Sequence, residues 1–156
     1  MIRPASGADA AAIAAIWNHI IRHTTKTFTT AEKDVAALAN QIGQQPFLVA
    51  DDGTGVRGFV TWSQFRAGPG YAYTVEHSIH VAQDAQGGGL GRALMASAED
   101  QARRAGLHSM IAGVAGENAG GAAFHAAIGY ATIARLPQVG WKFGRWHDLV
   151  LMQKML

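Results

Sequence analysis

Cysteine is absent from this chain of 156 residues, so neither a disulfide framework nor a thiolate nucleophile is available to it. Charge is also scarce: charged residues make up 15% of the sequence, the formal net charge is +2, and the basic residues are scattered. Because nucleic-acid binding usually needs a clustered basic surface, we expect no nucleic-acid partner. The lack of cysteine is compatible with a reducing compartment, and we expect a cytoplasmic protein.

Long hydrophobic runs are missing too. The most apolar stretch, Ala10–Trp17, has eight residues, whereas a helix needs about 20 to span a bilayer, so no membrane association is expected. Polar residues border it and no small-residue cleavage site follows, which favours a buried first helix over a signal peptide. Hydrophobic residues nevertheless make up 49% of the chain, a composition typical of globular proteins, and the length suits one domain, residues 1–156.

Hydrophobic periodicity divides the chain into helices and strands. A period near 3.6 predicts a first helix that Ser6 or Asp9 caps and that ends near Ile21. It predicts further helices over Glu32–Ile42, Leu90–Ala105 and Asn118–Ile128. Alternating or continuous apolar runs predict strands at Ile2–Pro4, Phe47–Ala50, Val56–Phe65, Tyr71–Val81, Ser109–Val114, Thr132–Leu136 and Asp148–Met155. The three strands between residues 47 and 81 should form an antiparallel meander. No linker or repeat divides the chain, which is therefore predicted to be an α/β protein with a mixed sheet.

The helix that begins at Leu90 is predicted to have one buried and one charged side. Glu99 with Arg103, and Asp100 with Arg104, have the i,i+4 spacing of ion pairs on a solvent-exposed side. The residues expected on the opposite side are Leu90, Leu94, Ser97, Gln101 and Ala105.

A glycine-rich turn, Gln86–Gly91, lies between a predicted strand and this helix. Glycines let the backbone approach a ligand closely, and the unpaired N–H groups of a first helical turn point at an approaching anion. The turn is therefore predicted to seat a pyrophosphate, with Arg92 adding a side-chain contact. It is no P-loop, since Gly-Lys-Ser/Thr is missing, and Arg92 stands where a dinucleotide fingerprint needs glycine. A purely structural glycine turn remains the alternative at this point.

Gln86-x-x-Gly89-x-Gly91 resembles the acetyl-CoA signature of the GNAT superfamily of N-acetyltransferases. Further segments resemble its phosphinothricin/methionine sulfoximine acetyltransferase group, in order over nearly the whole chain. Of these, Thr74-Val75-Glu76 and Lys142-Phe143-Gly144-Arg145-Trp146 are the more specific. The segments are Asn18–Phe28, Tyr73–Ser78, Glu117-Asn118, Phe124–Tyr130 and Val139–Asp148.

The resemblance implies the GNAT fold, a mixed seven-stranded sheet flanked by about four helices, in which two central strands part to admit the pantetheine arm. It implies acetyl-CoA as co-substrate and a homodimer, for which the aromatic segment Trp141–Trp146 is a candidate contact. Gly88 stands where relatives often carry a basic residue, so one phosphate contact is expected to be missing. The expected cofactor-binding residues are Ile79, His80, Val81, Gln86, Gly87, Gly88, Gly89, Leu90, Gly91, Arg92 and Asn118.

Glu76 is the first candidate for catalysis. Direct acetyl transfer needs a neutral amine, a stabilised carbonyl oxygen and a proton for the departing thiolate, and a carboxylate can accept the ammonium proton directly or through water. Strand alternation places Glu76 on one face with Thr74, Ser78 and His80, and His77 on the other. The alternative role is an ion pair on a solvated face; the resemblance of Thr74-Val75-Glu76 favours catalysis.

His125 falls where many superfamily members carry a tyrosine near the thiol. The resemblance therefore makes it a candidate to protonate the thiolate or to bind the cofactor, whereas its position alone would also suit a histidine on a helix surface. His77 and His80 should point to opposite sides of their strand, so no metal site is expected.

The expected acceptor is a small amino acid or analogue such as phosphinothricin, methionine sulfoximine or methionine sulfone. The resemblance implies that Arg66 holds its carboxylate, with Phe28 and Tyr73 as an apolar wall. His77 is expected to line the same pocket, with a solvated or core histidine as the alternative. Weaker candidates for the carboxylate are Lys26, Lys142 and Arg145. Two alternatives stay open: another amine or a protein N-terminus as acceptor, and an acyl-CoA-binding sensor without activity.

Overall fold

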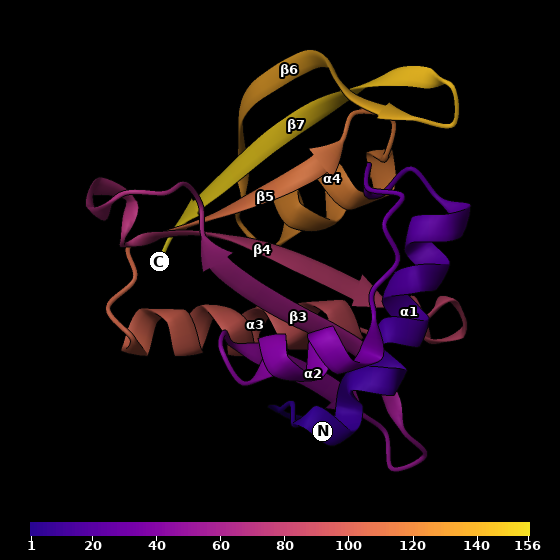
Figure 1. The fold of residues 1–156 in the computed structure, drawn as a ribbon. Coiled ribbons are helices and arrows are strands. Elements are labelled where there is room, and N and C mark those ends of the chain that lie inside the picture. Colours follow the sequence, from indigo (N-terminus) through magenta and orange to yellow (C-terminus); the bar gives the residue numbers. More distant parts are fainter.

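One mixed sheet of seven strands organises the chain, which a computed structural model describes over all residues 1–156 (Figure 1). The strands lie in the order β1-β2-β3-β4-β5-β7-β6, and every neighbouring pair is antiparallel except β4 and β5. Their bounds are β1 Ile2–Pro4, β2 Phe47–Asp51, β3 Val56–Gln64, β4 Thr74–Val81, β5 Ser109–Ala115, β6 Ala131–Lys142 and β7 Arg145–Met155. The predicted mixed sheet and its meander are confirmed.

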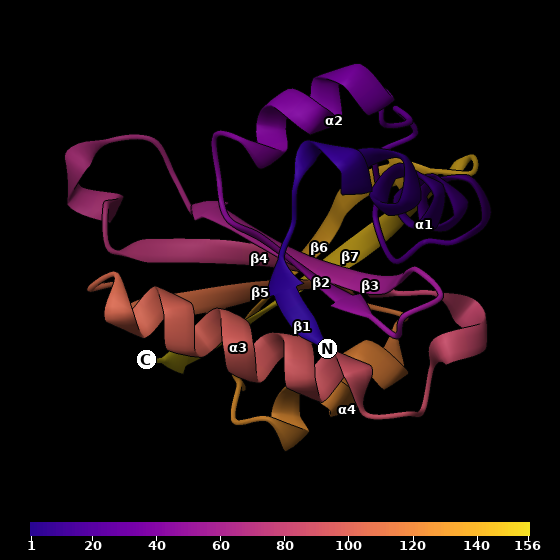
Figure 2. The ribbon, with the colours of Figure 1, turned by 90° about the horizontal axis from the view of Figure 1, so that it is seen from below.

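Four helices cover the two faces of this sheet. Helices α1 and α2 lie on one face, and α3 and α4 lie on the other (Figure 2). Their bounds are α1 Ala10–His23, α2 Val35–Ile42, α3 Leu90–Arg104 and α4 Ala119–Ala127. None of them is long and apolar enough to cross a membrane.

Several helices and strands begin or end at other residues than predicted, because caps and turns set their ends. Helix α2 begins at Val35 rather than Glu32, because the carboxylate of Asp34 accepts a hydrogen bond from Ala37 N at 2.9 Å and caps the helix. Strand β4 begins at Thr74, since Pro69–Tyr71 forms a 3-10 turn. The last two strands are longer than predicted and form one hairpin around Phe143 and Gly144, both with positive φ.

The buried side of α3 differs from the prediction. Leu90 and Leu94 contact the core as predicted, and the other residues of α3 in the core are Met95, Ala98 and Ala102. By contrast Gln101 and Ala105, which were expected there, are exposed. Spacings of three and four residues allow several stripes on a helix with so many alanines, and only the strands behind the helix decide between them.

Glu99 was also expected in solvent, and that was wrong. Its side chain is buried, and it accepts a hydrogen bond from Lys154 Nζ of β7 at 2.6 Å instead of pairing with Arg103. The predicted pair of Asp100 and Arg104 is present on the exposed side, at 3.7 Å. A counter-charge 55 residues away lies outside the reach of any helical spacing rule.

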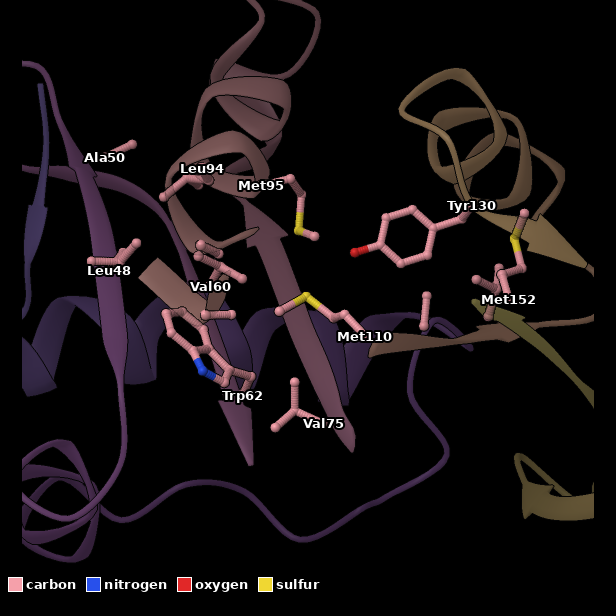
Figure 3. Packing of buried hydrophobic residues seen from close by; sticks show 14 residues of the cluster. Leu48, Ala50, Val60, Trp62, Val75, Leu94, Met95, Met110, Tyr130 and Met152 are labelled. Carbon is pink, nitrogen blue, oxygen red and sulfur yellow. The ribbon is translucent and has the colours of Figure 1, made fainter. Parts of the chain in front are cut away.

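Two clusters of buried side chains hold the layers together, one on each face. The larger lies under α3, where Trp62, Val75, Met95 and Met110 pack and the hydroxyl of Tyr130 points toward the methionines (Figure 3). The second cluster lies between the sheet and helices α1 and α2; its members are Ala10, Ile13, Ala14, Trp17, Ile21, Leu38, Phe47, Val49 and Phe59.

The sheet forks between its two parallel strands. Pairing of β4 with β5 runs from Thr74 opposite Ser109 to His77 opposite Ala112 and ends there. Beyond this point β4 stays paired only with β3, and β5 only with β7. The edges of β4 and β5 that face each other are therefore open, as the resemblance implied (Figure 1).

Candidate active site

A cavity of about 770 Å³ opens at this fork. Its walls come from α1, the loop between α1 and α2, β4, the glycine-rich turn with the start of α3, the end of β5, and α4. All predicted site residues line it except Gly88, Arg66 and Tyr73. The lining members of the predicted set are Phe28, Glu76, His77, Ile79, His80, Val81, Gln86, Gly87, Gly89, Leu90, Gly91, Arg92, Asn118 and His125.

The glycine-rich turn has a conformation that requires glycine. Gly87 and Gly89 both have a φ of +81°, a region that L residues rarely adopt, and Gly89 is the residue that caps α3. At Gly91 a Cβ would stand 3.3 Å from the ring of Phe124, so glycine permits the close approach of α3 and α4. Gly88 has neither constraint: its φ is not positive, and a Cβ would stand 3.8 Å from Ala85 O.

The start of α3 presents backbone donors to the cavity. The first backbone hydrogen bond of the helix runs from Ala93 N to Gly89 O at 3.1 Å, so the N–H groups of Leu90, Gly91 and Arg92 have no backbone acceptor. These donors and the positive end of the helix dipole suit an anionic ligand.

Glu76 lies half-buried on the face of β4 that looks toward α1. Its carboxylate is in no ion pair or side-chain hydrogen bond, and Oε2 lies near Gly113 of β5, where a Cβ would be 3.5 Å away. Burial raises the pKa of this carboxyl above its ordinary value. The ion pair considered for Glu76 is therefore absent, and an unpartnered carboxylate with a raised pKa suits a base near neutral pH.

His77 and His125 form a buried pair on the opposite face. Their Nε2 atoms are 2.9 Å apart, and His125 Nδ1 lies 2.8 Å from the carbonyl of Gly121. Since a carbonyl only accepts, Nδ1 of His125 carries a proton and donates it to Gly121 O. Nε2 of a neutral His125 then accepts from Nε2–H of His77. Both ring nitrogens of His125 are thus engaged inside the protein.

Burial keeps both rings of this pair neutral. It lowers the pKa of His77 to about 3 and also lowers that of His125. The pair lies at the fork and ties α4 to β4, because His77 is the last β4 residue that pairs with β5. Its geometry therefore suits positioning of α4 rather than delivery of a proton.

His80 points the other way, into the second core cluster. Its ring centroid lies 5.6 Å from that of Phe59 and 6.1 Å from that of Trp17, and burial lowers its pKa to about 4. The predicted opposite orientation of His77 and His80 is confirmed. No three His, Asp or Glu side chains are grouped as metal ligands.

Asn118 begins α4 beside the cavity. Its Oδ1 accepts a hydrogen bond from Gly121 N at 3.0 Å, which caps the helix and leaves its amide NH2 group free for a ligand. The preceding Glu117, which the sequence did not mark as a site residue in its own right, accepts two hydrogen bonds from Arg145 at 3.0 Å.

The loop between α1 and α2 is held against the β6–β7 hairpin. Lys142 is 1% exposed and donates hydrogen bonds to Thr24 O at 2.6 Å and Thr27 O at 2.8 Å. The ring of Phe28 stacks on His147 with centroids 5.4 Å apart, and a Cβ at Gly140 would overlap that ring. These contacts join segments more than 100 residues apart, so no local motif could reveal them.

Lys142 and Arg145 are therefore engaged inside the protein, although both were candidates for the substrate carboxylate. Lys142 bonds the loop carbonyls, and both terminal nitrogens of Arg145 bond Glu117. Lys142 holds the loop directly, and Arg145 holds it through Glu117, which also accepts a hydrogen bond from the hydroxyl of Thr25.

Arg66 and Tyr73 lie away from the cavity. Arg66 follows β3, with its guanidinium carbon 5.6 Å from the ring centroid of Tyr71. Tyr73 precedes β4 with an exposed side chain, and its carbonyl accepts from His108 N at 2.9 Å. Both are at the opposite end of β4 from the fork, so within one chain neither contacts the cavity.

Comparison with known proteins agrees with this geometry. The sequence-family model of the acetyltransferase (GNAT) domain matches residues 2–151, and the chain belongs to this family. The predicted family, fold and acetyltransferase class are thereby confirmed.

The chain is also similar to individual acetyltransferases. The chain is 41% identical to the L-methionine sulfoximine/L-methionine sulfone acetyltransferase of Salmonella typhimurium, over 99% of this chain and 94% of that protein. Its structure is similar to that of a ribosomal-protein-alanine N-acetyltransferase from Brucella melitensis, with a TM-score of 0.96, 36% identity, and 100% and 99% of the two chains covered. A phosphinothricin acetyltransferase from Sinorhizobium meliloti in complex with acetyl-CoA is similar with a TM-score of 0.94, 30% identity, and 100% and 88% covered.

Proposed function

We propose that the protein transfers the acetyl group of acetyl-CoA to the amino group of a small amino acid or analogue, of the methionine sulfone, methionine sulfoximine or phosphinothricin type. The observation that carries this proposal is the single cavity that joins the glycine-rich turn to Glu76 across the fork. The similarity to acetyltransferases for such compounds supports the choice of acceptor.

The residues at the fork fit the cofactor. Free N–H groups of Leu90, Gly91 and Arg92 suit the pyrophosphate, with the Arg92 side chain nearby. Beyond His77 the edge of β4 that faces β5 has no strand partner, so its peptide groups between residues 78 and 81 are available to the pantetheine amides. Asn118 offers its free amide from the other wall.

Glu76 is proposed as the base. Acetyl-CoA supplies a thioester whose carbonyl carbon bonds to the amine nitrogen while the C–S bond breaks. Coenzyme A leaves as a thiolate, and the second proton lost by the nitrogen balances the proton that the thiolate takes up through solvent. The amine must lose a proton to attack, and Glu76 accepts it directly or through a water molecule. His125 shapes the cofactor channel by holding α4, because both its ring nitrogens already have partners.

A thiol-release assay tests the proposal. Purified protein and acetyl-CoA are incubated with L-methionine sulfone, L-methionine sulfoximine, phosphinothricin, a peptide with an N-terminal alanine, or no amine. We expect thiol release only with the amino acids. Release only with the peptide would instead favour a protein N-terminus as acceptor, the function named for the Brucella melitensis relative. No release with any amine would favour a sensor and contradict the proposal.

We also propose a homodimer through the β6–β7 hairpin. Its tip exposes three large aromatic side chains, Trp141, Phe143 and Trp146, each more than half exposed. Light scattering on the protein and on Trp146→Glu tests this, since a dimer built there should dissociate in the variant. The cytoplasmic location and the absence of a metal stay predictions.

A further inference from the structure

Two ammonium groups on the loop between α1 and α2 line the cavity without a carboxylate partner. Lys26 and Lys33 both contribute to the wall, and no Asp or Glu oxygen lies within 4 Å of either. Most other basic side chains of the chain are paired or lie outside the cavity. An unpaired pair of cations beside a ligand cavity points to an anionic group on the ligand.

Lys33 is held in place by contacts with α1. Its Nζ lies 4.2 Å from the ring centroid of Trp17, a distance at which a cation and an aromatic face attract. Its backbone is fixed on both sides by Asn18, which accepts from Lys33 N at 2.6 Å and donates to Lys33 O at 3.1 Å. The ammonium group is thus positioned before a ligand arrives.

Both lysines lie on the same side of the cavity as the proposed base. Lys33 stands over the ring of Trp17, whose centroid lies 6.1 Å from that of His80, and Lys26 lines the same cavity from the same loop. His80 and Glu76 share one face of β4, the face toward α1. The third cation of the wall, Arg92, lies at the glycine-rich turn, where the pyrophosphate is proposed to bind.

Within one chain, the other candidates for an acceptor carboxylate are engaged by other groups or lie outside the cavity. Lys142 and Arg145 are engaged in bonds within the protein, and Arg66 does not line the cavity. An α-amino acid at neutral pH carries an ammonium group and a carboxylate. A wall with Glu76 and two lysines therefore complements both of its charges.

We propose that Lys26 and Lys33 form the subsite that binds the carboxylate of the amino-acid acceptor. This assignment rests on the proposed function, since it presumes an amino acid as the acceptor. The lysines orient the carboxylate while Glu76 faces the amine, and Phe28 on the same loop forms the apolar wall. Lys33 is partly buried, which strengthens its charge interactions relative to those of a fully exposed group, whereas Lys26 is exposed.

Calorimetry separates this subsite from turnover. L-methionine sulfone and its carboxamide are titrated into protein saturated with coenzyme A, which has no acetyl group to transfer. The sulfone carries a carboxylate and the carboxamide does not, while their side chains are the same. The variants are Lys26→Met and Lys33→Met, which keep the length of the side chain and remove its charge, and Lys33→Arg, which keeps the charge. Arg66→Met is included as the competing candidate outside the cavity. Arg104→Met, an exposed position at the end of α3, is the control.

Each Lys→Met change should weaken sulfone binding about tenfold and leave carboxamide binding within about twofold, with Lys33→Arg close to wild type. Arg104→Met should bind both ligands as wild type does. Equal weakening of both ligands, a loss confined to Arg66→Met, or no sulfone binding by the wild type would each overturn the subsite. If the sulfone binds through the lysines but no thiol is released, the proposed function fails and the subsite stands.

Discussion

The two ends of the cavity are built by different means. At the cofactor end, one continuous segment from Gln86 to Arg92 presents backbone N–H groups, and glycines give that backbone its shape. At the acceptor end, side chains from α1, the following loop and β4 converge, and the β6–β7 hairpin holds the loop in place.

The two ends should therefore differ in which substitutions they tolerate. Backbone donors are insensitive to side-chain identity as long as the φ angles of the turn are kept, so the cofactor end depends on a few glycines. The acceptor end depends on side-chain charge and on contacts such as Lys142 to Thr24, 118 residues apart. Acceptor specificity is therefore expected to change through substitutions that leave acetyl-CoA binding intact.

The largest expected effect is at the proposed base. Glu76→Gln should lower kcat at least about 100-fold with little change in the KM for acetyl-CoA, because the amide cannot accept the ammonium proton. The pH-rate profile should also lose the limb that rises as Glu76 deprotonates, since burial raises the pKa of that group. Initial rates from pH 5.5 to 9 measure both, with the exposed Glu32→Gln as control. An unchanged kcat and profile would remove Glu76 from the chemistry.

Lys142→Met tests whether the hairpin sets the acceptor end. Losing two hydrogen bonds from a charged donor should lower the free energy of unfolding by about 2–3 kcal/mol and raise the acceptor KM several-fold, as the loop with Phe28 loosens. The KM for acetyl-CoA should stay within about twofold. Urea unfolding and steady-state kinetics measure these quantities.

Lys154→Met is the matched control for this prediction. It also removes a partly buried ammonium, which bonds Glu99 and Ile128 O away from the loop. It should destabilise the protein without raising the acceptor KM. If both variants raise that KM equally, general loosening rather than the loop explains the effect.

Gly89→Ala tests the cofactor end, and Gly53→Ala is its control because both glycines have a similar positive φ. Gly89 and Gly53 have φ of +81° and +89°, and a Cβ at either would meet nothing within 4 Å. Each alanine should lower the free energy of unfolding by about 1–2 kcal/mol. Only Gly89→Ala should raise the KM for acetyl-CoA, about fivefold to tenfold, because Gly53 lies in the β2–β3 turn. Equal KM values for the two variants would contradict a backbone seat.

Two histidines of β4 with lowered pKa values, His77 and His80, should make stability depend on pH. The folded-state pKa values of His77 and His80 are about 3 and 4, below the ordinary 6.5. As pH falls below 6.5, the unfolded chain gains protons that the folded chain does not, so the free energy of unfolding falls. The slope contributed by His77 is at most about 1.4 kcal/mol per pH unit.

His77→Gln should therefore flatten this dependence between pH 6.5 and 5, whereas His19→Gln, at an exposed position of α1, should not. Urea unfolding at several pH values gives the slopes. Identical slopes in His77→Gln and wild type would show that the His77 ring takes up a proton as readily in the folded chain as in the unfolded one.

The smallest expected effect is a gain at Gly88. Because its φ is not positive and a Cβ fits there, Gly88→Arg should add a phosphate contact and lower the KM for acetyl-CoA about twofold to fivefold. The gain should shrink as salt is raised, which kinetics at 0.05 and 0.5 M NaCl would reveal. A KM that does not move would show that the side chain at this position points away from the cofactor.

Much of the fold followed from local patterns. The strand pattern from β1 to β5 and the glycine-rich turn before α3 reflect preferences of a few neighbouring residues. The buried side of α3 did not follow, because several stripes satisfy helical spacing and the counter-charge for Glu99 comes from β7. The same holds for Lys142, which was a candidate for the substrate carboxylate and is instead buried against carbonyls of a distant loop.

By itself, the sequence determined the family, the meander, the glycine-rich turn and the face of β4 that carries Glu76. Each of these depends on spacing along one segment or on a motif that spans a few residues. Only the tertiary structure decided that Arg66 and Tyr73 lie outside the cavity of their own chain. It also decided that His77 and His125 are hydrogen-bonded to each other, and that Lys26 and Lys33 line the cavity without a carboxylate partner. Those outcomes depend on which distant groups meet across the fork, and on which of them remain without a partner, so they emerge only when the segments pack.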